Sequence, residues 1–279
     1  TIRSNVCYRM STIEVNKIAP VSGGTNVTLG DSGDTFTIPS GATLNASSSN
    51  LANRPNANPL IINGDMAVAQ RSTSVTGHNS VSYTTVDRFK TVCEVGTYTV
   101  IQESLSSGAA YEAGFKNALR LDTTTAEASA GSAGEQTTIE QRIEGFNLQA
   151  FKKGTSNAEK FTLAFWVKSN KTGTSQVNLR DTDNTRLISA TYTISSANTW
   201  EHKVLNYAAD TTGAFDNDNA NSLQIEWFLD SGTDFSSGTA PTSWEASDNT
   251  DRNANNLALG NSTDNDFAIT GIQLEVGEY

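Results

Sequence analysis

The sequence predicts an all-β protein, with a β-sandwich over residues 58–279 preceded by a short, extended, β-rich segment over residues 1–57. Composition supports this class, because charged residues make up only 18% of the chain and aromatic residues 8%. Ser, Thr, Asn and Gly are abundant instead, as in short strands joined by turns. Apolar and polar residues alternate in several stretches, which is typical of strands with one buried face. Helical periodicity is nearly absent.

The first segment, 1–57, differs from the rest of the chain. Short alternating runs at 13–18, 25–29 and 35–38 are separated by Gly-rich turn clusters. Their apolar residues are too few to build a core, and a segment of this size usually needs cross-links or assembly to fold. We therefore expect it to oligomerise or to dock on a partner. The small, polar stretch 45–59 contains two prolines and predicts a linker, with a boundary near residue 57.

Three stretches of the second part alternate most clearly. Their apolar residues share one parity and predict the core faces of three strands: Phe161, Leu163, Phe165 and Val167; Leu223, Ile225, Trp227 and Leu229; and Ile188, Ala190, Tyr192 and Ile194. The final stretch, 267–276, changes parity at Gly271, which predicts a bulge or bend. Residues 147–154 predict one short helical turn ended by Gly154.

Charge and cysteine content restrict the partners and the cross-links. The net charge is −11, and no basic patch of the kind that nucleic-acid-binding proteins carry is visible, so we expect no nucleic-acid partner. No stretch approaches the ~18 apolar residues of a membrane span, so we expect no membrane insertion. Cys7 and Cys93 are the only cysteines. Two cysteines do not make a disulfide framework, and we expect both to be free thiols.

The sequence contains no motif for catalysis, cofactor binding or metal binding. His78 and His202 are the only histidines, and neither stands near a cysteine at the spacing of a metal site. A Gly-x-Ser-x-Gly elbow and a phosphate-binding loop are both missing. Acidic loops at 181–184, 216–221 and 248–251 depart from the EF-hand pattern and are interpreted as solvated turns. We therefore predict a protein that is not an enzyme and that holds neither metal nor cofactor.

The four tryptophans are the candidates for ligand contact. Trp227 lies on an apolar strand face and is predicted to belong to the core, Trp166 lies on the opposite face of its strand, and Trp200 precedes a strand. Trp244 lies in the polar loop 241–245. Flat rings in loops suit sugar stacking, because they join a large apolar face to a polar tip. Trp244 is therefore the candidate glycan contact, and burial in the core is the alternative for each tryptophan.

Six fragments, in a fixed order, resemble the jelly-roll domains of bacteriophage fibre and appendage proteins. The first and the last look like the opening and closing strands of one antiparallel sandwich. Residues 15–45 also resemble the N-terminal regions of marine phage tail-fibre-like proteins. The six fragments are IINGDMAVAQR (61–71), TTVDRF (84–89), TIEQRIEG (138–145), FTLAFWVKSNKTGT (161–174), TYTISSANTWEHK (191–203) and ITGIQLEVG (269–277).

The resemblance implies a C-terminal jelly-roll β-sandwich that is similar, more distantly, to carbohydrate-binding modules. Some of those modules hold a structural calcium ion where the first and last strands meet, with an acidic residue from each. Asp65 lies in the corresponding first fragment, but Thr270 stands where such modules often place Asp. The resemblance therefore does not predict a calcium site here.

The resemblance also implies a structural component of a phage virion, assembled in the host cytoplasm. In this interpretation the chain is a fibre or appendage subunit that forms a homo-oligomer, a trimer in the first instance. Residues 1–57 attach it to other virion proteins, and the jelly roll contributes to recognition of a host-surface glycan. Two alternatives stay open: a virion scaffold, adaptor or decoration protein without receptor binding, and a secreted carbohydrate-binding or carbohydrate-active module.

Overall fold

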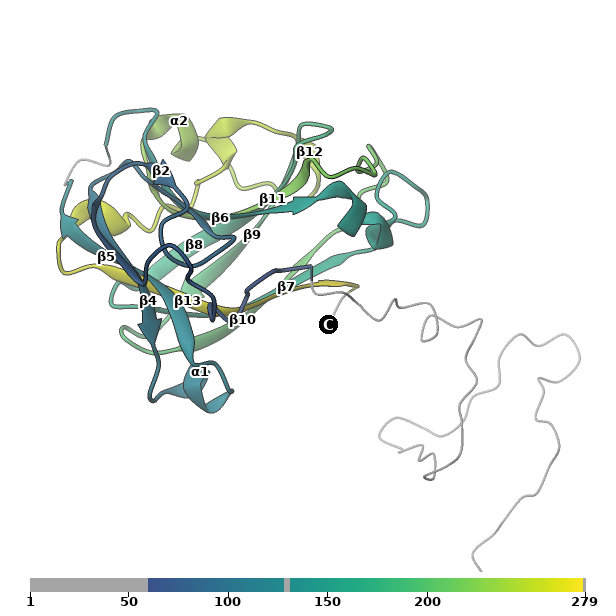
Figure 1. The fold of residues 1–279 in the computed structure, drawn as a ribbon. Helices are drawn as coiled ribbons and strands as arrows, with labels where there is room; N and C mark the ends of the chain where they lie inside the picture. The colour runs from purple at the N-terminus through teal and green to yellow at the C-terminus, as the bar shows by residue number, and fades with distance from the viewer. Residues whose placement is uncertain (1–59, 128–130, 278–279) are drawn as a thin grey trace, which may run out of the picture. The chain divides into compact units, whose positions relative to one another are not determined.

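The computed structural model describes residues 60–127 and 131–277 (Figure 1). Within these ranges the chain forms two antiparallel sheets that enclose one core, with only short helices. The predicted all-β, jelly-roll sandwich is confirmed for this part. The predicted segment 1–57, its boundary and Cys7 lie outside the described residues. No helix in the described part is long and apolar enough to cross a membrane.

Sheet A has six strands in the order β1-β4-β5-β13-β7-β10, and sheet B has seven in the order β12-β9-β8-β11-β6-β3-β2. Most neighbours are not consecutive in sequence, so the chain repeatedly crosses from one sheet to the other. The strands of sheet A are β1 Ser74–His78, β4 Thr97–Ser104, β5 Asn117–Thr125, β7 Phe161–Ser169, β10 Glu201–Tyr207 and β13 Asp266–Val276. Those of sheet B are β2 Val81–Ser82, β3 Lys90–Cys93, β6 Gln136–Glu144, β8 Gly173–Asp181, β9 Arg186–Ile194, β11 Asn221–Ser231 and β12 Glu245–Ala246.

Helical structure is limited to single turns between strands. The α-helices are α1 Ala109–Glu112 and α2 Thr233–Ser236, and the 3₁₀ turns are η1 Gly145–Asn147, η2 Gln149–Phe151, η3 Asn249–Asp251 and η4 Leu259–Asn261. The helical turn predicted over 147–154 is therefore two 3₁₀ turns. It ends at Lys152, which adopts the left-handed conformation (φ 50°), rather than at Gly154.

The core lies between the sheets, and the three predicted strand faces line it. The apolar residues of β7 and β11 on these faces are fully buried, and those of β9 pack in the same core. The rings of Phe165 from sheet A and Trp227 from sheet B meet edge to face, with centroids 5.8 Å apart. Each such side chain stabilises the fold by about 1.5–3 kcal/mol through burial.

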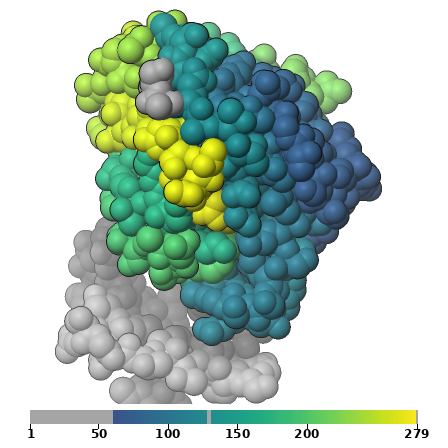
Figure 2. All heavy atoms as spheres, turned by 90° about the vertical axis from the view of Figure 1, so that its left-hand side faces the viewer, coloured from purple at the N-terminus to yellow at the C-terminus, as the bar shows by residue number. Residues whose placement is uncertain are grey.

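The bulge predicted at Gly271 is confirmed. The register of β13 against β7 shifts between Thr270 and Gln273, and Gly271 has φ 62°. The extra residue turns the strand over, so that Ile269 before it and Ile272 after it both face the core. Figure 2 shows the last part of the chain, in yellow, between teal and green parts, in keeping with the pairing of β13 with β5 and β7.

The opening fragment 61–71 is not a strand, so that expectation was wrong. Asn63 has φ 63°, and its side-chain amide donates to the carbonyls of Val68 and Asp87 while its Oδ1 accepts from the Val68 amide. These bonds close a turn. Asn tolerates the left-handed backbone conformation of this turn better than most residues do. The fragment nevertheless meets the last strand, because the Ile272 amide donates to the Gly64 carbonyl at 3.0 Å.

Candidate functional site

Trp244, the predicted glycan contact, lies in the loop before β12 and points inward. Its side chain is 8% exposed, and its indole N–H donates to the Ala208 carbonyl at 2.8 Å. Phe161 packs against the ring at a centroid distance of 5.8 Å, and the Lys153 ammonium lies 4.9 Å from its centroid. A sugar could stack on this ring only if the ring left that position. The contact at Trp244 stays a prediction.

The other tryptophans differ in their surroundings. Trp227 is fully buried, as predicted, and Trp200 is nearly buried immediately before β10. Trp166 is half-buried on the outer face of sheet A, where its ring lies 5.0 Å from that of His202. The packing alternative therefore describes Trp227 and Trp200.

Asp181 was interpreted as part of a solvated turn, and the structure corrects this. Its carboxylate accepts from the ammonium of Lys153, and both side chains are fully buried. The same ammonium contacts Asp210 at 2.9 Å and donates to the carbonyls of Thr212 and Gly213. Burial raises the pKa of Asp210, but the hydrogen bonds from Arg186 and Lys153 lower it by more, so that the pKa lies below its ordinary value. This cluster holds loops together inside the protein.

Cys93 and His78 are also internal. Cys93 is fully buried and free, and burial raises the pKa of its thiol far above its ordinary value. His78 is 6% exposed and lies 3.1 Å from the Thr91 hydroxyl, and burial lowers the pKa of its ring. Among the described residues, no group of three or more His, Cys, Asp or Glu side chains is placed to hold a metal ion.

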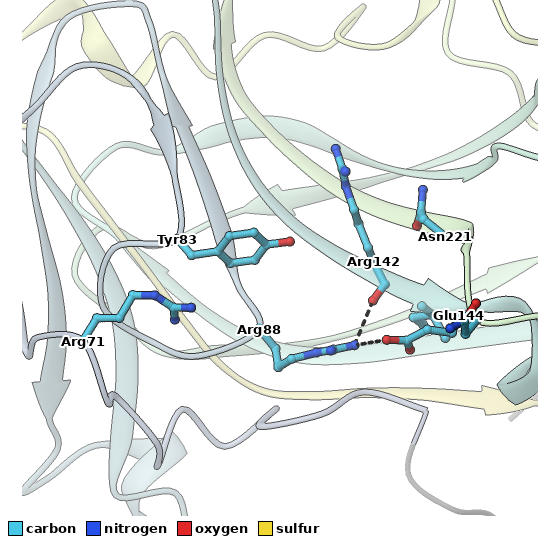
Figure 3. A pocket seen from close by; sticks show the side chains of 8 residues that line it. Arg71, Tyr83, Arg88, Arg142, Glu144 and Asn221 are labelled. Carbon is cyan, nitrogen blue, oxygen red and sulfur yellow. Dashed lines mark hydrogen bonds and ion pairs between the residues drawn. The ribbon is translucent and has the colours of Figure 1, made fainter.

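An arginine-lined cleft of about 280 Å³ opens at one end of sheet B (Figure 3). We call it the arginine cleft. Arg142 and Glu144 project into it from the outward face of β6, whereas Ile143 between them is buried. Asn221 begins β11 and pairs with Glu144. The described residues that line the cleft are Arg71, Tyr83, Arg88, Arg142, Ile143, Glu144, Asn219 and Asn221.

Three of the six fragments noted in the sequence meet at this cleft, and each contributes one arginine. Arg71 ends the fragment 61–71, Arg88 belongs to 84–89 and Arg142 to 138–145. These fragments lie far apart in the sequence, and their meeting in space was not predicted. Each fragment contains an arginine in an otherwise weakly charged chain, but the sequence does not indicate that the three arginines lie together.

Hydrogen bonds fix these fragments to one another. The Asp87 amide donates to the Val68 carbonyl at 2.9 Å, and the Asp87 carboxylate accepts from the Gln70 amide and from Arg71. The first fragment is also fixed to β6. The side-chain amide of Gln141 accepts from the backbone N–H of Ile62 and donates to the Ile62 carbonyl. The cleft wall is thus built before any ligand binds.

Arg88 has the left-handed backbone conformation, with φ 72°. This conformation is costly for a residue with a long side chain, and such strain is concentrated at functional sites. It directs the guanidinium to Glu144 Oε1 at 2.8 Å and to the Arg142 carbonyl at 3.4 Å. Burial raises the pKa of Glu144, but the hydrogen bond and charge of Arg88 outweigh this and lower the pKa overall. Glu144 is therefore ionised and paired.

Arg71 and Arg142 are more exposed than Arg88, and their charged partners lie farther away. The Arg71 side chain is 55% exposed, contacts Asp87 at 3.2 Å and lies 5.8 Å from the centroid of the Tyr83 ring. The Arg142 side chain is 45% exposed, and its nearest charged partner in the described part is Glu140, at 3.8 Å. The cleft therefore places three guanidinium groups against one carboxylate, although the whole chain has a net charge of −11.

The remaining outer face of sheet B is largely covered. The segment 232–258, which includes α2, packs on it (Figure 1), and Arg252 from this segment donates to Glu226 on β11 at 2.8 Å. Burial raises the pKa of Glu226, but Arg252 and Arg180 together hold it below its ordinary value. Because Glu226 has no exposed surface, this pair closes the sheet face beside the arginine cleft.

No family model matches the chain, and no curated protein matches it. Solved structures show a similar sandwich. The enzymatically active domain of tailspike protein 4 of bacteriophage CBA120 is 14% identical over 78% of this chain and 21% of that one, with a TM-score of 0.39. A putative sugar binding protein from Bacteroides thetaiotaomicron VPI-5482 is 14% identical over 78% of this chain and all of that one, with a TM-score of 0.41.

The tandem CBM22-1-CBM22-2 domain of Paenibacillus barcinonensis Xyn10C is 13% identical over 70% of this chain and 46% of that one, with a TM-score of 0.37. This chain thus spans about a fifth of the tailspike domain and about half of the tandem domain. At these identities the likeness concerns the sandwich fold alone. Because each of these TM-scores is below 0.5, none supports an inference about what this chain binds.

Proposed function

We propose that the sandwich binds a host-surface glycan without cleaving it, as part of a phage fibre or appendage subunit. The observation that carries the binding proposal is the arginine cleft. It combines a concave shape, a few converging polar groups and one exposed aromatic ring, Tyr83, which is 39% exposed. Ligand sites typically have these features, and an aromatic ring beside hydrogen-bond donors suits a sugar. The strained backbone of Arg88 supports the same location.

Binding rather than hydrolysis is supported by the carboxylates of the cleft. Most glycoside hydrolases use two carboxyl groups, one on each side of the scissile bond. Among the described lining residues a single carboxylate, Glu144, faces the cleft, and it is held by Arg88 at 2.8 Å. A group paired in this way is a poor proton donor, because its pKa is lowered.

The virion part of the proposal is supported by the sequence resemblance. In it, residues 1–57 join the subunit to other virion proteins and to further copies of the chain, as a homotrimer. Several copies on one particle would raise the avidity of a weak site without new contacts. The whole subunit would then be a structural protein of the virion that contributes to attachment.

The test is binding of the full chain to host surface polysaccharide, measured by isothermal titration calorimetry. Arg142→Gln is the cleft variant, and Lys116→Gln is the matched control, because Lys116 is an exposed cation on the connection between β4 and β5 in sheet A. Binding that Arg142→Gln weakens and Lys116→Gln preserves supports the proposal. A folded chain that binds no surface polysaccharide would point to the scaffold alternative. Release of reducing sugar would point to the carbohydrate-active alternative.

A further inference from the structure

We infer that the arginine cleft selects an anionic sugar unit, namely a uronate whose carboxylate is held by Arg142. This inference rests on the proposed function, since it names the class of glycan that the cleft takes. Its starting point is the charge pattern. The cleft concentrates three guanidinium groups in a protein that is acidic overall. Arg71 and Arg88 are paired with Asp87 and Glu144, so a negatively charged ligand group is attracted chiefly by Arg142.

Among the three arginines of the cleft, Arg142 has the most distant carboxylate partner. Its Nη2 lies 3.8 Å from Glu140 Oε2, beyond normal hydrogen-bond length. The same oxygen is already paired with Lys90 at 3.1 Å, and Glu140 Oε1 accepts from Thr138. Glu140 is therefore satisfied without Arg142. Arg88, by contrast, is already occupied by Glu144.

Arg142 is also held in place for a ligand. It lies on β6, whose backbone pairs with β11 over most of its length, so its position does not depend on a mobile loop. The carbonyl of Arg142 accepts from Arg88, which fixes the strand end beside the cleft. Figure 3 shows the Tyr83 hydroxyl directed toward Arg142, with Arg71 on the other side of the Tyr83 ring. A sugar placed against Tyr83 would bring its substituents close to both cations.

The ligand class follows from the shape of the donor group and the size of the cleft. A guanidinium group matches a planar carboxylate, because two parallel N–H groups meet two oxygens. A cleft of about 280 Å³ lies near the lower end of the ~300–1,000 Å³ range of ligand sites, which suits about one sugar unit. A nucleic acid would need a longer basic track to neutralise successive phosphates, and the net charge of −11 opposes that.

The experiment compares acidic oligosaccharides with their neutral counterparts. Hexamers of galacturonate, mannuronate and guluronate and a glucuronate-containing hexasaccharide are titrated into the full chain, each beside its carboxyl-reduced form. We expect at least one uronate hexamer to bind at 50 mM salt and its reduced form to bind ten-fold or more weakly. Arg142→Gln should lower uronate affinity about ten-fold. Arg142→Lys should recover only part of it, and Lys116→Gln should leave it unchanged.

Two outcomes would overturn the inference and leave the proposed function intact. One is equal binding of a uronate hexamer and its reduced form. The other is binding of host polysaccharide by a chain that ignores every uronate probe. Tighter binding of a single-stranded oligonucleotide than of any uronate, with the same dependence on Arg142, would also overturn the inference. A chain that is folded by circular dichroism but binds neither the probes nor host polysaccharide would overturn the proposed function as well.

Discussion

The ammonium of Lys153 lies 2.5 Å from the carboxylate of Asp181, and neither side chain has any exposed surface. The pair joins the turn after η2 to the end of β8. Removing one member of a buried ion pair costs more than the pair itself contributes, because the other charge is left without a partner.

Lys153→Met should therefore lower the free energy of unfolding by about 3–5 kcal/mol. The neighbouring residue gives a matched control, because Lys152 pairs with Glu159 on the surface, where the two side chains are 49% and 40% exposed. Lys152→Met should change stability by less than about 0.5 kcal/mol. Urea unfolding of the full chain measures both. Equal midpoints for the two variants would contradict the structural role of Lys153.

Gly271→Ala should destabilise the fold through backbone strain and through a clash with a neighbouring ring. A comparison with Gly77, where only the backbone strain applies, separates the two effects. The φ of 62° at Gly271 is unfavourable for Ala, and a Cβ would lie 2.6 Å from the Phe115 ring. Gly77 has φ 69° but nothing within 4 Å of its Cβ position. Gly77→Ala should therefore cost about 1–2 kcal/mol from the backbone alone, and Gly271→Ala about 1–3 kcal/mol more from overpacking. Thermal unfolding of both variants is the measurement. A Gly271→Ala variant as stable as Gly77→Ala would show that Phe115 moves aside freely.

Cys93 should not react with dithiobis(nitrobenzoic acid) while the protein is folded. Burial keeps its thiol protonated by raising the pKa, and the thiolate is the reactive form. The Cys7→Ser variant allows Cys93 to be followed alone, by absorbance during labelling. We expect negligible labelling in buffer and complete labelling in denaturant. Rapid labelling of the native protein would mean that β3 opens easily.

His78 should make stability depend on pH below its ordinary pKa of 6.5. Burial lowers the pKa of the folded ring, and a hydrogen bond with Thr91 opposes this only in part. As pH falls through 6.5, the unfolded chain binds a proton that the folded chain resists, so stability is full above this pH and is lost below it. The midpoint of urea unfolding between pH 7.5 and 5.5 reports this. His78→Gln should flatten the dependence, and a dependence that is unchanged in this variant would contradict the role of His78.

Trp244→Phe separates the two roles considered for that residue. From its packing we expect a loss of about 1–3 kcal/mol of stability, because the Ala208 carbonyl loses the indole donor. Affinity for host polysaccharide should be unchanged while the protein remains folded. The sequence-based hypothesis instead expects the Trp244→Ala variant, which lacks the ring altogether, to bind several-fold more weakly, since a stacking ring contributes about 1 kcal/mol. Calorimetric titration together with unfolding curves decides between them.

The parts of the fold that could be predicted are those specified by local pattern. The alternation of apolar and polar residues along 161–169 and 221–231 predicts the buried faces of β7 and β11, because the two-residue period of a strand is visible within one segment. The parity change at Gly271 gives the bulge for the same reason. The turn at Asn63-Gly64 had a signal as well, since Asn-Gly is a turn dipeptide, but the apolar residues before it suggested a strand.

The sites could not be predicted, because they depend on contacts between distant residues. Lys153 and Asp181 are 28 residues apart, and neither position differs in type from the solvated charges around it. The arginine cleft joins Arg71, Arg88 and Arg142 only after the strands of sheet B pair. Trp244 is buried although its loop is polar, because the loop folds back against Phe161. Composition of a loop does not report such packing.

The lengths of the outermost strands have a consequence for aggregation. Sheet B ends in the two-residue strands β12 and β2, which offer a foreign strand little backbone to pair with. The outer strand β1 of sheet A is interrupted by a register shift. The strand β10, by contrast, pairs regularly with β7 over seven positions and is the longest regular edge in the described part. Unwanted strand addition during production should therefore begin at β10. Lys203 lies on the same, inward face of β10 as the buried Leu205. A charge in that position opposes the addition of a foreign strand to β10.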